Sequence, residues 1–349
     1  MSKSNYYTRR KLIVVRDYCI SWTIAFIVFA LVRGLGTEEQ GSLRLDFASS
    51  VKIVLTLGPI MGVFSGLTQV WMEDRIYRRV SILKFLALRL VNTLLFLVLL
   101  MVSAFLVYKT YFNLQQSFAA FAFQAGGFAV YFYLILIDLL INTMRQLNLM
   151  FGGRNLAKIL TGKFYIPREE ERVFMFLDLQ SSTQLAEKLG HQLYSSLIQD
   201  CFNDLAVVIE CQAEIYQYVG DEAVLTWNRS AGLEHDNAIN AYFRYKDQLE
   251  SRESYYMKTY GVIPFFKAGM HLGIVMVTEI GKYKREIAYH GDTINTAARI
   301  QGQCNALKAE LLISEDLKQH IQGPYQAKNV GSILLRGKES EVDIYALSR

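Results

Sequence analysis

The stretch FMFLDLQSST at residues 174–183 decides the fold class of the C-terminal half. Residues 173–177 are apolar and predict a short strand, which ends at Asp178. A polar turn follows, and Ser182 or Thr183 is expected to cap the helix that comes next. Outward from this point, strands and helices alternate, which predicts a sheet with helices packed on it. The predicted strands are 173–177, 213–219, 222–227, 265–277, 310–313, 333–336 and 342–347, and the predicted helices are 183–189, 192–211, 236–260 and 293–304.

A second carboxylate lies in YVGDEAVLTW at residues 218–227, where Asp221 follows Gly220 at a predicted turn between two strands. The tip of this hairpin can approach Asp178 if its strands pair with the first strand. A carboxylate at a strand end, beside the free N–H groups of a helix start, suits a metal-bound polyphosphate. Two such carboxylates can hold a pair of Mg²⁺ ions for displacement at phosphorus. Taken singly, each motif is equally consistent with an ordinary helix cap or an ordinary turn.

A third motif, HGDTINTAARI, occupies residues 290–300. Asn295 and Arg299 are four residues apart, so a helix projects both side chains from one face. An amide and a guanidinium on one face can orient a ribose and stabilise charge that grows on a phosphoryl group. The alternative is a solvent-exposed arginine beside an asparagine at a helix start.

The N-terminal half has a different composition. The whole chain is 52% hydrophobic with a mean hydropathy of +0.18, and its long apolar runs are confined to the first 145 positions. A membrane-spanning helix needs roughly 20 mainly apolar residues. We therefore predict a transmembrane domain at residues 1–144 with four helices, near 18–32 (extended back toward residue 12), 49–71, 82–107 and 118–144.

The basic residues predict the orientation of these helices, because loops rich in Lys and Arg stay in the cytoplasm. Both termini are expected to be cytoplasmic, in a multi-pass protein of the cell (inner) membrane. The net charge of +5 comes without a block of basic residues interleaved with aromatics, which argues against nucleic-acid binding. The four cysteines show no CxxC spacing, which argues against a zinc site or a disulfide framework. The basic residues that set the orientation are Arg9, Arg10, Lys11, Arg75, Arg78, Arg79, Arg145, Arg154 and Lys158.

Two further features concern packing and coupling. Gly58, Gly62 and Gly66 lie on one helical face and allow another helix to approach closely, either as ordinary packing or as part of a signal relay. Residues 145–172 are expected to form a cytoplasmic coupling linker, whose charged run REEER at 168–172 should be solvated. The remaining residues, 173–349, form the predicted catalytic domain.

The order and spacing of FLDLQSST, YVGDE, HGDTINTAARI and LLRGKESEVDIY resemble the catalytic domain of the class III nucleotide cyclases. The resemblance covers about residues 170–347 and implies an α+β, ferredoxin-like domain behind the helical transmembrane bundle. It implies that Asp178 and Asp221 bind two Mg²⁺ or Mn²⁺ ions and that Asn295 and Arg299 are catalytic. The positions that the resemblance assigns to substrate binding are Lys267, Gln217, Ala288, Thr183, Arg336 and Lys338.

The family works as dimers in which one chain supplies the aspartates and its partner the asparagine and arginine. The implied reaction is attack of the ribose 3′ hydroxyl on the α-phosphate, giving a 3′,5′-cyclic nucleotide and pyrophosphate in a membrane-bound homodimer. Gln217 and Ala288 depart from the residues that select the base in the family. Gln217 can donate and accept hydrogen bonds, so it can read either purine. ATP is the expected substrate because it is the commoner one in the family, and GTP is the alternative.

Three other readings compete with an active cyclase of this class. A diguanylate cyclase would need glycine and phenylalanine where Val219 and Ala223 stand. Diguanylate cyclase domains also have no counterpart of the HGDTINTAARI segment. A membrane sensor with a catalytically silent cyclase-like domain is compatible with the altered base positions, but it has no chemical need for all four catalytic and metal-binding side chains. A transporter with a regulatory domain fits poorly with four spans that contain few charges.

Overall fold

A computed structural model describes the chain except for residues 1–2, 37–46, 76–81, 114, 124, 151–157, 160 and 335–340. The chain divides into two compact units, Met1–Leu147 and Asn148–Arg349.

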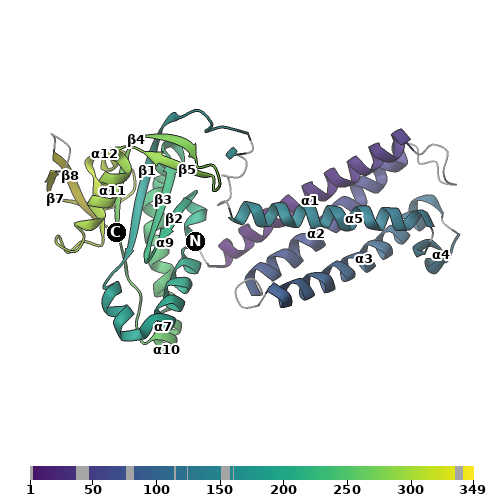
Figure 1. The fold of residues 1–349 in the computed structure, drawn as a ribbon, viewed down its shortest axis with the longest axis horizontal. Coiled ribbons are helices and arrows are strands. Elements are labelled where there is room, and N and C mark those ends of the chain that lie inside the picture. The colour runs from purple at the N-terminus through teal and green to yellow at the C-terminus, as the bar shows by residue number, and fades with distance from the viewer. Residues whose placement is uncertain are drawn as a thin grey trace. The chain divides into compact units, whose positions relative to one another are not determined.

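The secondary-structure elements described in the first unit are all helices (Figure 1). Its helices are α1 (Lys3–Gly36), α2 (Phe47–Arg75), α3 (Ile82–Phe112), the short α4 (Phe118–Ala122) and α5 (Ala125–Met150).

The prediction of four long apolar helices is confirmed. Among the described residues, the segments long and apolar enough to cross a membrane are Lys11–Val32, Val51–Glu73, Val91–Phe112 and Gly127–Leu149. The predicted start of the fourth span at residue 118 is wrong. Ser117 caps the separate helix α4 by accepting a hydrogen bond from the N–H of Ala120, and the apolar segment of α5 begins at Gly127.

The glycine face of α2 contacts α1, as predicted. A Cβ atom placed on Gly62 would lie 2.3 Å from the Cα of Cys19. Gly58 and Gly66 face Thr23 and Val15 at similarly short distances, so both helices contribute one residue per turn to the contact. Only glycine allows the two backbones to come this close.

Polar side chains inside the helical unit are paired with one another. The Tyr18 hydroxyl donates to Oδ1 of Asn142 at 2.7 Å. Arg145 on α5 forms an ion pair with Glu73 on α2, with 3.1 Å between Nε and Oε1, and the Glu73 side chain is only 5% exposed. Polar and charged groups are costly in an apolar environment unless they are satisfied in this way. These contacts therefore help to fix how the helices of the unit pack.

In the second unit, eight strands of the described chain form one sheet with the order β2-β3-β1-β4-β6-β8-β7, and β5 pairs with β4 outside this order. All pairings are antiparallel except β4 with β6. The prediction of a C-terminal ferredoxin-like α+β domain is thus confirmed. The strands are β1 (Arg168–Leu179), β2 (Glu214–Val219), β3 (Glu222–Asn228), β4 (Phe266–Ile280), β5 (Glu286–His290), β6 (Leu311–Ser314), β7 (Gln326–Leu334) and β8 (Glu341–Ser348).

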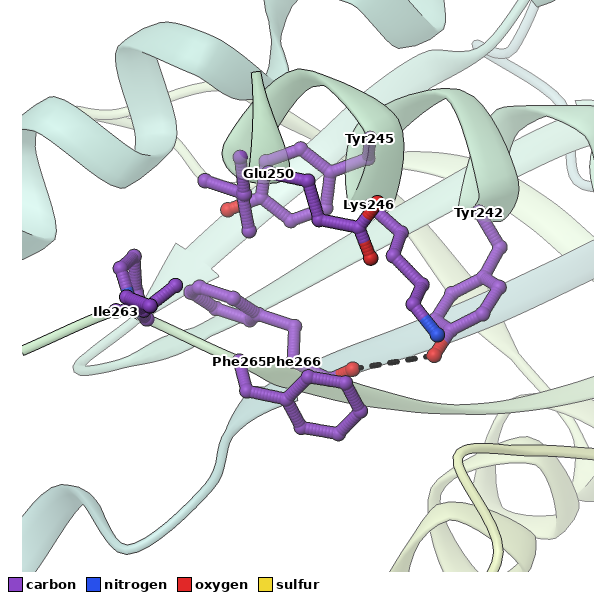
Figure 2. A pocket seen from close by; sticks show the side chains of 9 residues that line it. Tyr242, Tyr245, Lys246, Glu250, Ile263, Phe265 and Phe266 are labelled. Atoms are coloured by element: carbon purple, nitrogen blue, oxygen red, sulfur yellow. Dashed lines mark hydrogen bonds between the residues drawn. The ribbon is translucent and has the colours of Figure 1, made fainter. Parts of the chain in front are cut away.

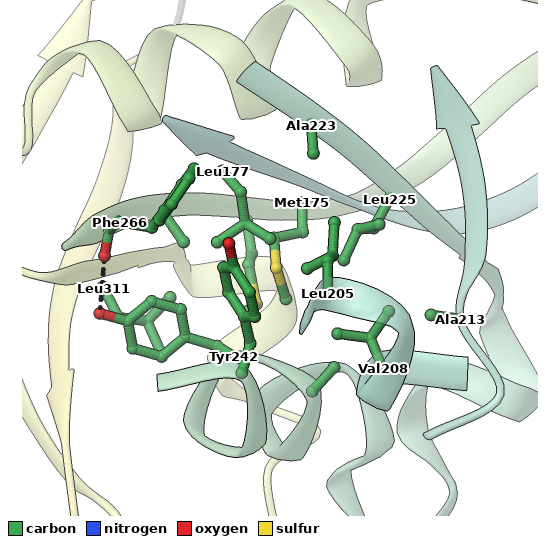
Figure 3. Packing of buried hydrophobic residues seen from close by; sticks show 14 of the residues in the cluster. Met175, Leu177, Leu205, Val208, Ala213, Ala223, Leu225, Tyr242, Phe266 and Leu311 are labelled. Carbon is green, nitrogen blue, oxygen red and sulfur yellow. Dashed lines mark hydrogen bonds between the residues drawn. The ribbon is translucent and has the colours of Figure 1, made fainter. Parts of the chain in front are cut away.

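Alternation along β1 separates the two faces of this sheet. Met175 and Leu177 point into the larger core, where they pack against Leu205, Val208 and Tyr242 from the helical layer (Figure 3). Phe174, Phe176 and Asp178 alternate with them and so point to the opposite face. The helices of the unit are α7 (Ser182–Asp204), η1 (Leu205–Cys211), α8 (Arg229–Leu233), η2 (Glu234–Asp236), α9 (Asn237–Glu250), α10 (Glu253–Tyr260), α11 (Asp292–Gly302) and α12 (Glu315–Lys318).

Several predicted boundaries differ from the structure. The helix predicted at 236–260 is two helices, α9 and α10, separated at Ser251 and Arg252. The helix predicted at 192–211 begins within α7, whose backbone is non-helical at Gly190 (φ 72°), and it finishes as the 3-10 helix η1. Strand β5 was not predicted, because its five residues carry too short an apolar pattern to stand out.

The expectation that the run at 168–172 is solvated is wrong for Arg172. This run is the first part of β1, and the Arg172 side chain is 0% exposed. The Arg172 guanidinium forms ion pairs at 2.8 Å with Glu170 and Glu214 and lies over the ring of Tyr289. Lys158 pairs with the same Glu214 carboxylate at 2.9 Å. The charges are buried because they neutralise one another, which charge content alone cannot reveal.

Candidate active site

Asp178 lies near the end of β1 and is half-buried. The strand register places it directly opposite Glu222 on β3 and directly opposite Lys267 on β4. Residues opposite one another in antiparallel strands point to the same face. Three ionisable side chains from three neighbouring strands therefore lie in a row across the sheet.

Asp221 is brought beside this row by the turn between β2 and β3. Val219 pairs with Glu222, which leaves Gly220 and Asp221 as a two-residue turn. Gly220 has a φ of 62°, a conformation that glycine adopts without strain. Because Glu222 is opposite Asp178, its neighbour Asp221 lies next to the end of β1.

The electrostatics reflect this crowding of carboxylates. Burial, together with the negative charge of Asp221, raises the pKa of Asp178, while a hydrogen bond from the Gln301 side chain opposes the rise. Burial, together with the charges of Asp178 and Asp221, raises the pKa of Glu222 to about 7. Both shifts show that burial and the neighbouring carboxylates make the ionised forms of Asp178 and Glu222 less favourable.

This donor set fits a divalent cation that shares its ligands with a substrate. In the described part of the chain, no three His, Cys, Asp or Glu side chains converge as a ready-made metal cage. Mg²⁺ is commonly held by one or two carboxylates plus substrate phosphate oxygens, with several waters retained. Asp178 and Asp221 supply two carboxylates of that kind, so the residues present fit such an ion.

Helix α7 begins directly after β1, beside Asp178. The predicted cap by Ser182 or Thr183 is wrong: Ser181 holds the N-cap position in a left-handed conformation, and its side chain forms no capping hydrogen bond. Thr183 is exposed in the first turn. Backbone N–H groups that no side chain caps at a helix start provide a favourable place for an anion such as a phosphate.

Tyr194, further along α7, reaches back toward the same site. Its hydroxyl forms a hydrogen bond with Ser182, and burial with the charges of Asp221 and Asp178 raises its pKa. The sequence analysis did not select Tyr194, because eleven residues separate it from Thr183 and only the course of the helix returns it to the carboxylates.

Asn295 and Arg299 both lie on α11, as predicted. Asn295 is exposed, whereas Nη1 of Arg299 is buried and has no hydrogen-bond partner among the described residues. A buried guanidinium N–H without an acceptor is energetically costly, so this nitrogen favours contact with an anionic or carbonyl oxygen. The interactions that act on Asp178 do not include either residue.

The remaining predicted substrate positions are spread over the sheet. Lys267 lies in the carboxylate row, and its Nζ donates to Oδ1 of Asn305 at 2.8 Å. Gln217 is exposed on β2, and Ala288 is buried on β5 opposite Thr278. Arg336 and Lys338 lie outside the described residues. The described chain thus brings together Asp178, Asp221 and Lys267 with the start of α7, and adds Glu222 and Gln301, which the sequence analysis missed.

A separate small pocket lies between α9 and the segment that leads into β4 (Figure 2). The Tyr242 hydroxyl donates to the carbonyl of Phe266 at its edge, at 3.3 Å. Its volume of about 140 Å³ is below the roughly 300–1,000 Å³ of sites for small organic ligands. None of the candidate site residues lines it; its walls are Tyr242, Tyr245, Lys246, Leu249, Glu250, Ile263, Pro264, Phe265 and Phe266.

Comparison with known proteins agrees with this geometry. Residues 164–349 match the family model of the adenylate and guanylate cyclase catalytic domain. The chain is 35% identical over 202 residues to adenylate cyclase 2 of Rhizobium meliloti (strain 1021), covering 57% of this chain and 56% of that protein. It is 22% identical over 226 residues to adenylate cyclase 1 of the same strain, covering 57% of this chain and 34% of that protein. The chain thus spans only part of the length of the curated relatives that it matches.

Among solved structures, a bacterial light-regulated adenylyl cyclase shares the fold with a TM-score of 0.55 and 18% identity, over 65% of this chain and 67% of that chain. At this identity the likeness concerns the fold alone. The match to the family model covers more than half of the chain and contains the carboxylate row, the start of α7 and helix α11. The chain therefore belongs to the adenylate and guanylate cyclase family of class III.

Proposed function

We propose that this protein converts ATP to 3′,5′-cyclic AMP and pyrophosphate as a membrane-bound homodimer. The observation that carries the proposal is the arrangement of Asp178 and Asp221 beside the uncapped start of α7. The 35% identity to an adenylate cyclase supports ATP as the substrate. GTP is the second candidate, because Ala288 offers the base no side-chain hydrogen bond and Gln217 can read either purine.

The proposed roles follow from where each group lies. Asp178 and Asp221 would hold two Mg²⁺ or Mn²⁺ ions, which supply charge neutralisation and activation of the attacking oxygen. The N–H groups at the start of α7, near Thr183, would bind the triphosphate, and Lys267 would contribute a positive charge beside it. Arg336 and Lys338 are proposed as further triphosphate contacts on the basis of the resemblance alone.

Asn295 and Arg299 are proposed to act on the site of a second copy of the chain. Asn295 is exposed, and Nη1 of Arg299 has no hydrogen-bond partner within the part of the chain that the structure describes, which supports a role that needs a partner chain. Asn295 would orient the ribose, and Arg299 would stabilise the charge that develops on the α-phosphate during attack by the 3′ hydroxyl.

In the remainder of the chain, we propose that residues 1–144 anchor the protein in the inner membrane with both termini in the cytoplasm, and that residues 145–172 couple them to a catalytic domain at 173–349. The four long apolar helices support the anchoring. The pairing of Lys158 with Glu214 supports the coupling, because it ties the segment before β1 to the buried Arg172 network.

The test is cyclic nucleotide production by the detergent-purified full-length protein. ATP and GTP are supplied separately, with Mg²⁺ and then Mn²⁺, and Asp221→Ala is assayed beside the wild type. We expect cyclic AMP from the wild type and none from Asp221→Ala. If only cyclic GMP formed, the proposed mechanism would stand and GTP would replace ATP as the substrate. If dimeric wild-type protein formed no product under any of these conditions, the result would count against the proposed activity and favour a silent sensor domain or a cyclase that requires its signal.

A further inference from the structure

Helix α11 is fixed against the sheet by an unusually close contact. A Cβ atom on Gly269 of β4 would lie 2.1 Å from the backbone N of Gln301, and one on Gly273 would lie 2.6 Å from Oγ1 of Thr293. Thr293 also donates to the carbonyl of Ile274 at 2.6 Å. Contacts near both ends of the helix thus hold it flush on β4, which leaves the position of Gln301 little freedom.

This position places Gln301 beside Asp178. Gly269 is opposite Phe176, two residues before Asp178 on β1, so the C-terminal end of α11 lies over this part of the sheet. The half-buried side chain of Gln301 reaches the Asp178 carboxylate, and its hydrogen-bonding interaction lowers the pKa of Asp178 against the larger effect of burial. The Nζ of Lys267, directly opposite Asp178, donates to Asn305.

The chemistry of an amide suits this place. Asp178 already lies close to the charges of Asp221 and Glu222. A glutamine N–H₂ group donates a hydrogen bond without adding charge, so it can fix the rotation of a carboxylate and leave its second oxygen free. Outer groups that orient a ligating carboxylate in this way affect metal affinity strongly.

We propose that Gln301 is a positioning residue that orients the Asp178 carboxylate for divalent-cation binding. The inference rests on the proposed function, because it assumes that Asp178 is a metal ligand. It also gives α11 two tasks: Gln301 serves the site of its own chain, while Asn295 and Arg299 on the same helix are proposed to serve the site of the partner.

The test measures Mn²⁺ binding to the full-length protein saturated with 3′-deoxy-ATP, which supplies the phosphate oxygens but lacks the attacking hydroxyl. Electron paramagnetic resonance reports on the bound metal without turnover. Gln301→Met keeps the approximate length of the side chain and removes the donor, and Gln301→Ala removes both. The matched control is Gln303→Met, which makes the same exchange at the residue that follows α11; Gln303 is not among the groups that act on Asp178. Asp178→Ala shows how much Mn²⁺ binding is lost when the proposed metal-binding carboxylate is removed.

We expect Gln301→Met and Gln301→Ala each to weaken Mn²⁺ binding by roughly tenfold or more, with an unchanged melting temperature for Gln301→Met and unchanged affinity for Gln303→Met. Wild-type affinity in Gln301→Met would overturn the inference, and a loss confined to Gln301→Ala would show that the residue only fills space. If wild type and Asp178→Ala bound Mn²⁺ equally, the metal assignment of Asp178 in the proposed function would fail first.

Discussion

The Arg299 side chain combines an energetic cost to the folded chain with a proposed role in catalysis. Its Nη1 atom is buried without a partner in the described chain, so removing the guanidinium removes a desolvated donor as well as the group that we propose acts in catalysis. By contrast, the guanidinium of Arg252 is well paired, since its Nη1 donates to both carboxylate oxygens of Asp204 at 2.7 Å.

For Arg299→Met we expect kcat to fall by about 10²–10³-fold, the usual cost of losing one donor to developing charge. The melting temperature should stay level or rise, because the buried Nη1 has no hydrogen-bond partner among the described residues to lose. Steady-state kinetics and thermal unfolding measure the two effects. Arg252→Met is the control for stability and should melt lower, since it leaves the Asp204 carboxylate without its ion pair. A clear drop in melting temperature for Arg299→Met would contradict the argument.

Glu222 gives the catalytic unit a predicted dependence of stability on pH. Its pKa is raised to about 7 in the folded protein, so between its ordinary value and about 7 the folded state holds a proton that the unfolded state has lost. Stability must then fall as pH rises through this window and level off above it. In EDTA, we expect the melting temperature of the wild type to fall between about pH 5 and 8 more than that of Glu222→Gln. Parallel pH profiles for the two proteins would exclude this role for Glu222.

At the scale of elements, two helices owe their positions to glycines on the surface that they contact. Helix α1 rests on the glycine face of α2, and α11 rests on Gly269 and Gly273 of β4. Such contacts are sensitive to single atoms, because interiors are close-packed and the atom in the way is backbone rather than a flexible side chain. If a side chain is added at one of these glycines, the whole helix packed against it has to move.

The substitution Gly62→Ala tests this for the membrane unit. The added Cβ would lie 2.3 Å from the Cα of Cys19, so α1 must shift, at a cost of about 1–3 kcal/mol. Gly127→Ala on α5 is the matched control, since its nearest contact, at 3.5 Å on Tyr131, is ordinary. Thermal unfolding in detergent should show a lower melting temperature for Gly62→Ala. Gly127→Ala should show no decrease, since this substitution also gains helix propensity. Equal melting temperatures for Gly62→Ala and Gly127→Ala would mean that α1 can shift away from α2 without loss of stability.

At the scale of the whole molecule, the proposed division of labour between two copies can be tested by mixing. Asp178→Ala and Arg299→Ala are each expected to be inactive alone. In a twofold-symmetric dimer, coexpression should make about half of the dimers mixed, each with one of two sites intact, and restore about a quarter of wild-type activity. Two copies of Asp178→Ala with different tags serve as the control. If no activity returned in purified mixed dimers, each site would have to be built from one chain.

The membrane arrangement gives a second prediction at this scale. The positive-inside pattern predicts that both termini lie in the cytoplasm. Reporter fusions at the N-terminus and at the C-terminus should therefore both give the cytoplasmic signal, while a reporter inserted between the first two spans gives the opposite one. A periplasmic N-terminus would require an odd number of crossings before the catalytic unit.

The sequence by itself determined the features that periodicity and local chemistry record. Four long apolar runs were enough to predict the four long apolar helices, and the alternation of strands and helices was enough to predict a sheet with helices packed on it. The glycine face of α2 and the spacing of Asn295 and Arg299 on one helix were also visible, because each depends on residues within a few turns of one another.

The tertiary structure alone decided which distant groups meet. The register of β1 with β3 and β4 put Glu222 and Lys267 beside Asp178, and the seating of α11 on Gly269 brought in Gln301. Arg172, read as solvated from its charged surroundings, is buried within ion pairs supplied in part by another strand. The physical reason is the same in each case: a sequence pattern shows which side of an element is buried, while the partner that covers it comes from elsewhere in the chain.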